Sequence, residues 1–240
     1  MNDLAVNLLA SAIAGVTVWL GQKAVRVRRL ARLRAFLGAA AGARCTVAVA
    51  RHAASPSPVS VHRRDLAAVV EVATLLRQCG ASADVLVSDT DLRGVGDTTE
   101  FCIGGPIMNS RSAAHLARFA PALTIAPISE DPDGMTMRLA GKEFRRVPGA
   151  EEYVLVLRIA TAVGARLPLW VICGQTARSN HAAAHWLSTG SRALVRRHGT
   201  TGSFAVALKV VNPRAYDHHF VEVAAEFTAE DLAAPPAVAA

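Results

Sequence analysis

The feature that most constrains this chain is a long uncharged segment close to its amino terminus. From Leu4 to Gln22, 19 consecutive residues carry no charge, and as a helix they would measure about 28 Å at 1.5 Å per residue. This length nearly matches a hydrocarbon core of roughly 30 Å. Asn7, Ser11 and Thr17 dilute the apolar character, so insertion is favourable by a modest margin only. The segment predicts one membrane-spanning helix.

A strongly basic stretch follows directly. Six Lys or Arg residues lie between Lys23 and Arg34, whereas only Asp3 stands in front of the apolar segment. By the positive-inside rule the basic flank stays in the cytoplasm, and a cleaved signal peptide would carry its basic residues in front instead. We therefore predict an uncleaved, single-pass protein of the plasma membrane, with its carboxyl-terminal domain in the cytoplasm. An anionic lipid surface is the partner expected for Lys23 to Arg34.

An alternative for the same region stays open. Residues 4–37 also fit a long buried or amphipathic helix of a soluble protein, because Val27, Leu30, Leu33 and Leu37 fall on one stripe. The two interpretations differ in where the basic residues would lie. A span places them at a lipid surface, and a soluble helix places them on its solvent face.

The rest of the chain is close to electrically neutral. The formal net charge is +7, but residues 1–64 hold ten Lys or Arg and one acid, whereas residues 65–240 hold 16 basic and 18 acidic residues. A domain that grips DNA or RNA needs a basic face on the folded part itself, to displace counterions from phosphates. We therefore expect no nucleic-acid partner.

Beyond the basic stretch, continuous apolar runs alternate with helical patterns. Helices are predicted at 62–79, 110–119 and 180–197, strands at 45–50, 84–87, 101–103, 123–126, 153–159, 169–173, 204–210 and 220–227, and a hairpin at 135–147 that turns at Ala140-Gly141. Continuous apolar strands separated by helices are typical of parallel sheets buried on both faces. The predicted fold class is α/β, with a mainly parallel, Rossmann-like sheet that has helices on both faces and is preceded by one transmembrane helix.

These patterns divide the chain into four segments. They are a transmembrane anchor at 1–22, a basic juxtamembrane helix and hinge at 23–42, a cytoplasmic α/β domain at 43–228, and a tail at 229–240. Two prolines and many small residues predict that the tail is disordered.

The cysteines do not form a recognisable metal or redox motif. Cys45, Cys79, Cys102 and Cys173 contain no CxxC pair and show no metal-ligand spacing with the eight histidines. We expect reduced, buried thiols and no metal site. The sequence identifies no cofactor.

Two similar stretches of sequence are the most informative feature of the α/β part. The stretch FCIGGPIMNSRSAAHL at 101–116 matches VICGQTARSNHAAAHW at 171–186, so that Gly104 aligns with Gly174 and His115 with His185. In each stretch an apolar strand ends at glycine, a polar loop follows, and a helix begins at Asn or Ser. The two histidines fall inside the helices, where packing or surface roles are expected. Both stretches are predicted to be strand-loop-helix turns.

Such turns suit anionic ligands. Glycine at the end of a strand permits close backbone approach, and a helix amino terminus presents unpaired N–H groups with a partial positive charge. The expected ligand is therefore a nucleotide-like or other anionic small molecule, bound by Gly104, Gly105, Asn109, Ser110, Arg111, Gly174, Thr176, Arg178, Ser179 and Asn180. The alternative is that these residues only cap helices and form turns, because neither loop is a GxGxxG or a GxxxxGK[ST] motif.

Parts of the sequence also resemble a known group of proteins. The stretches EFCIGGPIMNSRSAAHLARF, EYVLVLRIA and WVICGQTARSNHAAAHWL, with the anchor and basic flank, resemble uncharacterised single-pass membrane-anchored proteins of high-GC actinobacteria. The GGPxxN element from Gly104 to Asn109 is similar to turns in Rossmann-like modules of prokaryotic sensor and surface proteins. The resemblance covers roughly residues 1 to 230. It implies the fold and no particular reaction.

Two functional hypotheses use the paired loops. The first is a sensing or signalling module at the membrane that binds an anionic small molecule without turnover. The second is an enzyme acting on a nucleotide or sugar phosphate, in which Glu100, Asn109, Asn180 or His181 polarises the substrate or transfers a proton. The sequence assigns no catalytic residue and does not decide between them.

A third hypothesis uses the amino-terminal helix instead. The chain would then be a structural or interaction protein, such as an effector at the membrane, whose helix self-associates through Ala10, Ala14 and Gly15. A homo-oligomer is left open by all three hypotheses.

Overall fold

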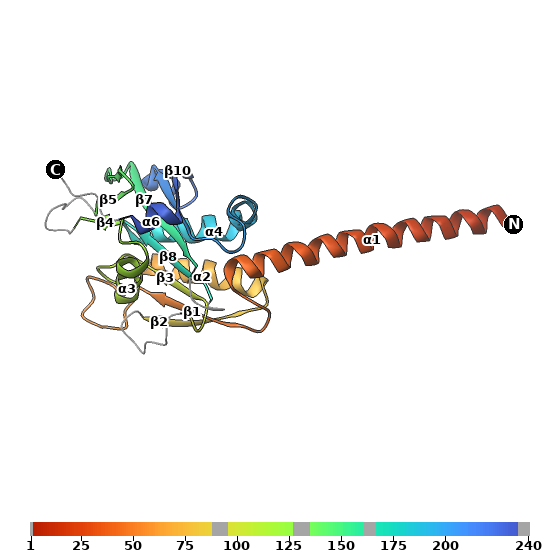
Figure 1. Ribbon diagram of the computed structural model, residues 1–240, viewed down its shortest axis with the longest axis horizontal. Coiled ribbons are helices and arrows are strands. Elements are labelled where there is room, and N and C mark those ends of the chain that lie inside the picture. Colours follow the sequence, from red (N-terminus) through yellow and green to blue (C-terminus); the bar gives the residue numbers. More distant parts are fainter. Residues whose placement is uncertain (1, 88–95, 127–134, 161–166, 235–240) are drawn as a thin grey trace.

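The computed structural model is an α/β globule from which one long helix projects (Figure 1). The structure describes the chain except for residues 1, 88–95, 127–134, 161–166 and 235–240, and residues 2–6, 9, 10 and 12 by their backbone alone. Helices and strands lie within a few residues of their predicted positions. The α/β class is confirmed.

A seven-stranded sheet with the order β10-β9-β7-β8-β3-β1-β2 forms the centre of the globule. Its parallel half consists of β1 (Arg44–Val49), β2 (Ser82–Val87), β3 (Glu100–Ile103) and β8 (Leu169–Gly174). Its antiparallel half extends from β8 through β7 (Glu151–Ile159), β9 (Phe204–Val211) and β10 (Val221–Thr228). The sheet is therefore mixed.

The prediction of a mainly parallel, Rossmann-like sheet is wrong for a reason that lies in the connections. Residues 160–168 link β7 to β8, and residues 212–220 link β9 to β10. Parallel neighbours need a crossover of a dozen or more residues, whereas antiparallel neighbours can be joined by a short link. Both links are too short for a crossover, so the strands that they join run in opposite directions.

Helices cover both faces of the sheet (Figure 1). On one face, α2 (Arg63–Gln78), α4 (Ala177–His198) and the end of α1 (Asn2–Leu37) pack on the large core cluster. On the other face lie α3 (Ser110–Phe119), α6 (Ala229–Ala233) and a small sheet made of β4 (Thr124–Ile125), β5 (Met137–Leu139) and β6 (Lys142–Phe144). A short helix, α5 (Pro213–Tyr216), lies between β9 and β10.

The predicted hairpin is present and belongs to this small sheet. Strands β5 and β6 pair in antiparallel fashion, and the turn between them places Ala140 at φ 49° and Gly141 at φ 75°. Met137, Leu139 and Phe144 are buried against the second face of the large sheet. The hairpin therefore packs as part of the core.

The carboxyl-terminal end of α1 is built into the core. Phe36 packs edge-on against Trp170, with ring centroids 5.1 Å apart, and its carbonyl accepts a 2.9 Å hydrogen bond from Arg158 Nε. The chain then turns at Gly38, whose φ is +72° and where a Cβ atom would lie 2.4 Å from Pro168 Cδ. Leu33 and Leu37 are also buried. This end of α1 is therefore fixed to the sheet.

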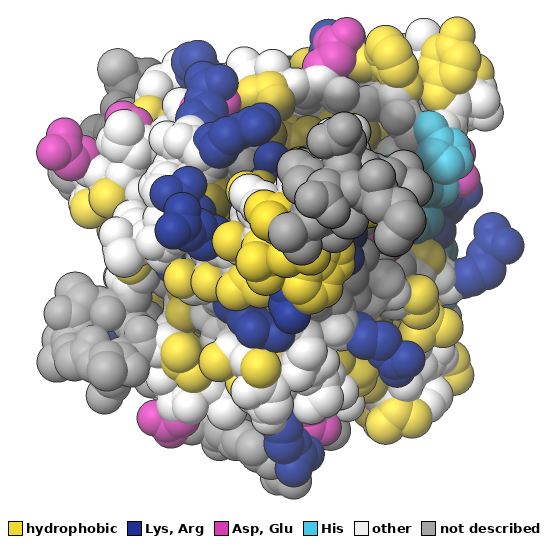
Figure 2. Space-filling view, turned by 90° about the vertical axis from the view of Figure 1, so that its right-hand side faces the viewer, with side chains coloured by type: hydrophobic (Ala, Val, Ile, Leu, Met, Phe, Trp, Pro, Cys, Tyr) yellow, Lys and Arg dark blue, Asp and Glu magenta, His cyan; other side chains and the backbone are white. Residues whose placement is uncertain are grey.

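The remainder of α1 stands free of the globule. Side chains from Ile13 to Arg29 are exposed, and Figure 2, which looks at the amino-terminal end of α1, shows apolar side chains with Lys and Arg around them. No helix among the described residues is both long and apolar enough to cross a bilayer. The predicted single-pass anchor at 4–22, with its plasma-membrane location and cytoplasmic domain, is therefore wrong. The polar residues Ser11, Thr17 and Gln22 lower the hydropathy of a helix whose length alone would suffice.

The segment predicted to be a disordered tail begins with ordered structure. Residues 229–233 form α6, which Thr228 and Asp231 cap with reciprocal hydrogen bonds, and Leu232 is buried. Residues 235–240 of this predicted tail lie outside the described residues.

Candidate functional site

A cavity of about 300 Å³ lies at the carboxyl edge of the parallel strands. Its walls come from the segments after β1 (Ala50 to Ala54), after β3 (Gly104 to Met108) and after β8 (Gly174 to Asn180), and from the start of α2. The chain passes from β1 to β2 on one side, while β3 lies on the other side of β1. This is the topological switch point, where ligands of open α/β sheets bind. We call it the edge cavity.

A larger hollow of about 660 Å³ lies beside the end of α1. Gly38 and Pro168 line it, so it sits at the opposite edge, where the parallel strands begin. Ligand sites of such sheets form at the carboxyl ends of strands, and the edge cavity is therefore the better candidate despite its smaller volume.

The loop after β8 forms one wall of the edge cavity. Thr176 caps α4 by accepting from the backbone N–H of Ser179, and the Ser179 hydroxyl accepts from the N–H of Thr176 in return. The side chain of Asn180 accepts a 2.8 Å hydrogen bond from the N–H of Gly174. A Cβ at Gly174 would lie 2.4 Å from Ser179 Oγ, so only glycine fits beneath this turn. Ala177, the first residue of α4, lines the cavity, so the amino-terminal end of α4 lies at this wall.

The start of α2 supplies the titratable groups of the edge cavity. His62 caps α2, with its Nδ1 accepting from the N–H of Arg64, and its ring stacks on that of His52 at 5.3 Å. Asp65 is 5% exposed and accepts a 2.9 Å hydrogen bond from Asn180 Nδ2. Burial raises the pKa of Asp65, and the hydrogen bond from Asn180 offsets only part of that rise. The cavity thus holds a carboxyl group with a raised pKa beside two imidazoles.

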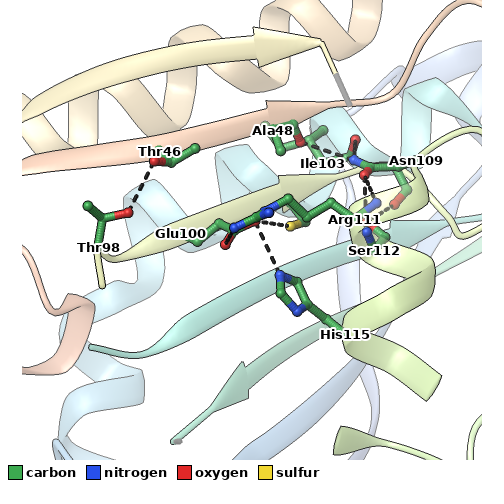
Figure 3. A network of polar contacts seen from close by, with 11 residues as sticks. Thr46, Ala48, Thr98, Glu100, Ile103, Asn109, Arg111, Ser112 and His115 are labelled. Atoms are coloured by element: carbon green, nitrogen blue, oxygen red, sulfur yellow. Dashed lines mark hydrogen bonds and ion pairs between the residues drawn. The ribbon is translucent and has the colours of Figure 1, made fainter. Parts of the chain in front are cut away.

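The loop after β3 approaches the cavity through its backbone. Gly104 has φ +109°, and a Cβ there would lie 2.4 Å from the Cβ of Ala50. Asn109 is fully buried: its Oδ1 accepts from the N–H groups of Arg111 and Ser112, while its Nδ2 donates to the carbonyls of Ala48 and Ile103 (Figure 3). Asn109 thereby ties α3 to β1 and β3 and has no free group for a ligand.

A buried ionic network lies beneath α3, outside the edge cavity. The Arg111 guanidinium pairs with both oxygens of Glu100, and His115 Nε2 lies 3.2 Å from Glu100 Oε1 (Figure 3). Burial by itself would raise the pKa of Glu100, but the hydrogen bonds from His115 and Arg111 outweigh it and lower this pKa to about 2. Glu100 is therefore an anion whose hydrogen-bonding capacity is already used.

The same network contains the compact group of metal-ligand atoms found among the described residues. Glu100, Cys102 and His115 each offer one such atom, and these atoms lie within 4.8 Å of one another. The Arg111 guanidinium already neutralises Glu100, and burial raises the pKa of the Cys102 thiol well above its ordinary value. A cation would have to displace Arg111, so this network is a structural ion pair.

Half of the predicted ligand residues line the edge cavity: Gly104, Gly105, Gly174, Thr176 and Asn180. The other five residues do not line it. Asn109 and Ser179 are capping residues, Ser110 is exposed at the start of α3, and Arg111 is paired with Glu100. Arg178 lies 3.6 Å from Asp217 and 3.8 Å from Glu152.

Four residues that line the edge cavity are not among the ligand residues predicted from the sequence. Arg51, His52, His62 and Asp65 line the edge cavity, yet they belong to neither of the two matching stretches. One signal was available, because a loop after a predicted first strand of a parallel sheet lies at the same edge as the loops after its neighbours.

Comparison with protein-family models, with curated proteins and with solved structures finds no match to this chain.

Proposed function

We propose that this protein binds a small anionic metabolite in the edge cavity. The observation that carries the proposal is the position of the cavity at the switch point between β1 and β3, with the loops after β1, β3 and β8 as its walls. Its volume of about 300 Å³ is at the lower end of the range for ligand pockets, so a mononucleotide or sugar phosphate fits better than a dinucleotide.

The charges around the edge cavity support a ligand with two kinds of group. Arg51 and the first turn of α4 attract an anionic group such as a phosphate or carboxylate. Asp65 has a carboxylate oxygen for a hydroxyl or amino group of the same ligand, because Asn180 occupies only one of its oxygens. An anionic group joined to hydroxyl groups is the chemistry of nucleotides and sugar phosphates.

The test is a thermal-shift titration of the purified full chain with nucleoside monophosphates, sugar phosphates, dicarboxylates and inorganic phosphate. Saturable binding to the folded state raises the melting temperature in proportion to the logarithm of ligand excess. We expect one class of phosphorylated compound to raise the melting temperature of the wild type. A panel that leaves the wild type unchanged at millimolar concentrations would overturn the proposal.

A pair of matched variants locates the site. Ala177 is the first residue of α4 and lines the edge cavity, whereas Ala229 is the first residue of α6 and does not. An acid at this position suits a helix dipole, so Ala177→Glu and Ala229→Glu should both fold. The ligand-dependent shift should vanish in Ala177→Glu, through charge repulsion, and persist in Ala229→Glu. Equal shifts in the two variants would place the ligand elsewhere.

Catalysis is a second candidate function, favoured by one observation. Asp65 has a raised pKa and shares the edge cavity with His52 and His62, so acid and base groups stand together there. Two of the four residues that the sequence suggested for catalysis serve other purposes, because Glu100 is paired with Arg111 and Asn109 is fully bonded. Of the other two, Asn180 lines the edge cavity and His181 does not. If the bound compound is converted, product should form with the wild type and fail to form with Asp65→Asn, while Asp84→Asn, on β2, retains turnover.

A further inference from the structure

Four of the eight histidines of the chain gather outside the edge cavity. They are His181, His185, His218 and His219, here called the histidine cluster. The ring centroids of His181 and His218 lie 3.9 Å apart, those of His218 and His219 also 3.9 Å, and those of His185 and His218 5.3 Å. None of the four lines the edge cavity.

The fold brings the cluster together from two distant segments. His181 and His185 are four residues apart on α4, so they project from the same face of that helix one turn from each other. His218 and His219 follow α5 in the link between β9 and β10, just after Asp217, whose φ is 53°. An i, i+4 pair of histidines on a helix is a common half of a metal site, and the link supplies further imidazoles from the other side.

A carboxylate already orients one of the four rings, and a second carboxylate lies near another. Glu71 on α2 lies 3.0 Å from Nδ1 of His185, and the hydroxyl of Ser188 donates to the other oxygen of Glu71 at 2.8 Å. A carboxylate at Nδ1 of His185 leaves its Nε2 as the coordinating atom, and this is the usual outer shell of a metal-bound histidine. Asp217, which Arg64 holds by an ion pair, lies 3.5 Å from Nδ1 of His218, but this nitrogen has no hydrogen-bond partner among the described residues.

The fold leaves a buried ring nitrogen of the cluster without a hydrogen bond from the part of the chain that the structure describes. Nδ1 of His181 is buried and has no hydrogen-bond partner among the described residues. Neutral imidazole is the form that binds a metal, and a metal would give this nitrogen the partner it lacks.

We propose that the histidine cluster binds one divalent transition-metal ion through imidazole nitrogens. A ligand set of imidazoles without thiolates suits Zn²⁺, Ni²⁺ or Cu²⁺, and Zn–N bonds of roughly 2.0–2.1 Å require the His218 ring to turn out of its stack on His181. Glu71 is a positioning residue in this site. Arg64 and Arg178 both face Asp217, which therefore acts through His218 and is not itself a ligand.

The test is a titration of the purified full chain, free of any polyhistidine tag, with Zn²⁺ by calorimetry and with Co²⁺ by visible absorption. We expect one equivalent to bind per chain, with the absorption bands of nitrogen-coordinated Co²⁺. His185→Gln should weaken binding at least about tenfold, and Glu71→Gln about 10–100-fold, as is typical of outer-shell partners. His198→Gln, near the end of the same helix and outside the cluster, should leave the affinity unchanged.

Three results would overturn the proposal. The first is the absence of saturable binding to the wild type. The second is binding that survives in a His181→Gln/His185→Gln double variant whose circular dichroism matches that of the wild type. The third is binding that His115→Gln abolishes and the double variant retains, because that result would assign the metal to Glu100, Cys102 and His115. His219→Gln, at an exposed position, provides a milder variant if the double variant does not fold.

Discussion

At the scale of single residues, the most consequential group is a carboxylate that the fold keeps charged in its interior. Glu100 is 1% exposed and depends on Arg111 and His115 for its hydrogen bonds. Removing one member of such a network leaves the others buried and unpaired, which is more destabilising than the pair itself is stabilising. Glu100 therefore couples the stability of the protein to pH.

The first prediction concerns this coupling. The pKa of Glu100 is lowered from 4.5 to about 2, so the folded state resists protonation at pH values where the unfolded chain accepts it. The resulting stability is present above about pH 4.5 and is lost as the pH falls towards 2. Urea unfolding across this window should show a steep loss of unfolding free energy in the wild type and a shallower one in Glu100→Gln. Glu222→Gln, at an exposed site, should keep the wild-type slope.

The second prediction concerns the floor of the edge cavity. Gly104→Ala combines strain from φ +109° with a Cβ contact of 2.4 Å to Ala50, whereas Gly141→Ala has a similar strain at φ +75° and open space around it. Backbone strain of this kind costs on the order of 1–3 kcal/mol. Gly104→Ala should therefore lower the unfolding free energy clearly more than Gly141→Ala, as measured by urea denaturation. Equal losses of unfolding free energy would mean that Ala50 can move away from the added Cβ without a measurable free-energy cost.

At the scale of helices and strands, the positions of the elements could be predicted but the directions of several strands could not. Apolar runs and cap residues are local, so α2 begins after His62 and α3 after Asn109, close to where the sequence placed them. Strand direction depends on the distance that a link has to span. Residues 160–168 are too few for a crossover, and the apolar pattern of β7 and β8 carries no information about their direction.

The candidate site was predictable to a similar extent. The glycine turns after β3 and β8 repeat each other in sequence, so Gly104 and Gly174 could be assigned to one edge of the sheet. Asp65, His218 and His219 lie outside the two matching stretches. His185 and His218 become neighbours only through the packing of α4 against the link between β9 and β10.

The third prediction compares two helix caps with the same hydrogen-bonding pattern. Thr176 at α4 and Thr228 at α6 each form a capping box, and loss of such a cap costs about 1 kcal/mol. Thr176 also donates to Glu152, which is 2% exposed. Thr176→Ala should therefore destabilise the protein more than Thr228→Ala in chemical denaturation. Equal losses would mean that Arg146 or Arg178, which lie 3.6 Å and 3.8 Å from Glu152 Oε1, satisfies Glu152 without the hydroxyl.

At the scale of the whole molecule, the globule has one hydrophobic core on each face of the sheet, and α1 packs against the globule only at its carboxyl-terminal end. Leu33, Phe36 and Leu37 contribute to the larger core cluster, whereas the side chains from Ile13 to Arg29 contribute to neither. Of the residues of α1, only those in its last turns should therefore be needed for the globule to fold.

The fourth prediction follows from this division. Deletion of residues 2–28 should leave the melting temperature nearly unchanged, because it removes exposed side chains. Deletion of residues 2–37 should lower the melting temperature sharply, because this deletion abolishes the ring contact of Phe36 with Trp170 and the hydrogen bond from Arg158 to the Phe36 carbonyl. Differential scanning calorimetry of both fragments gives the comparison. A large loss in the shorter deletion would mean that the free part of α1 contributes to folding.

The anchoring of α1 also has a mechanical consequence. The Arg158 guanidinium donates hydrogen bonds to the carbonyls of Phe36, Gly202 and Thr200. The carboxyl-terminal end of α1 is therefore expected to move together with the sheet. The free part then acts as a lever about 42 Å long, at 1.5 Å per residue, and a tilt of about 10° at the globule sweeps its tip through roughly 7 Å. A small rotation of the globule therefore moves the far end of α1 much further than it moves the surface of the globule itself, and Arg158 on β7 is one of the residues that connect the helix to the sheet.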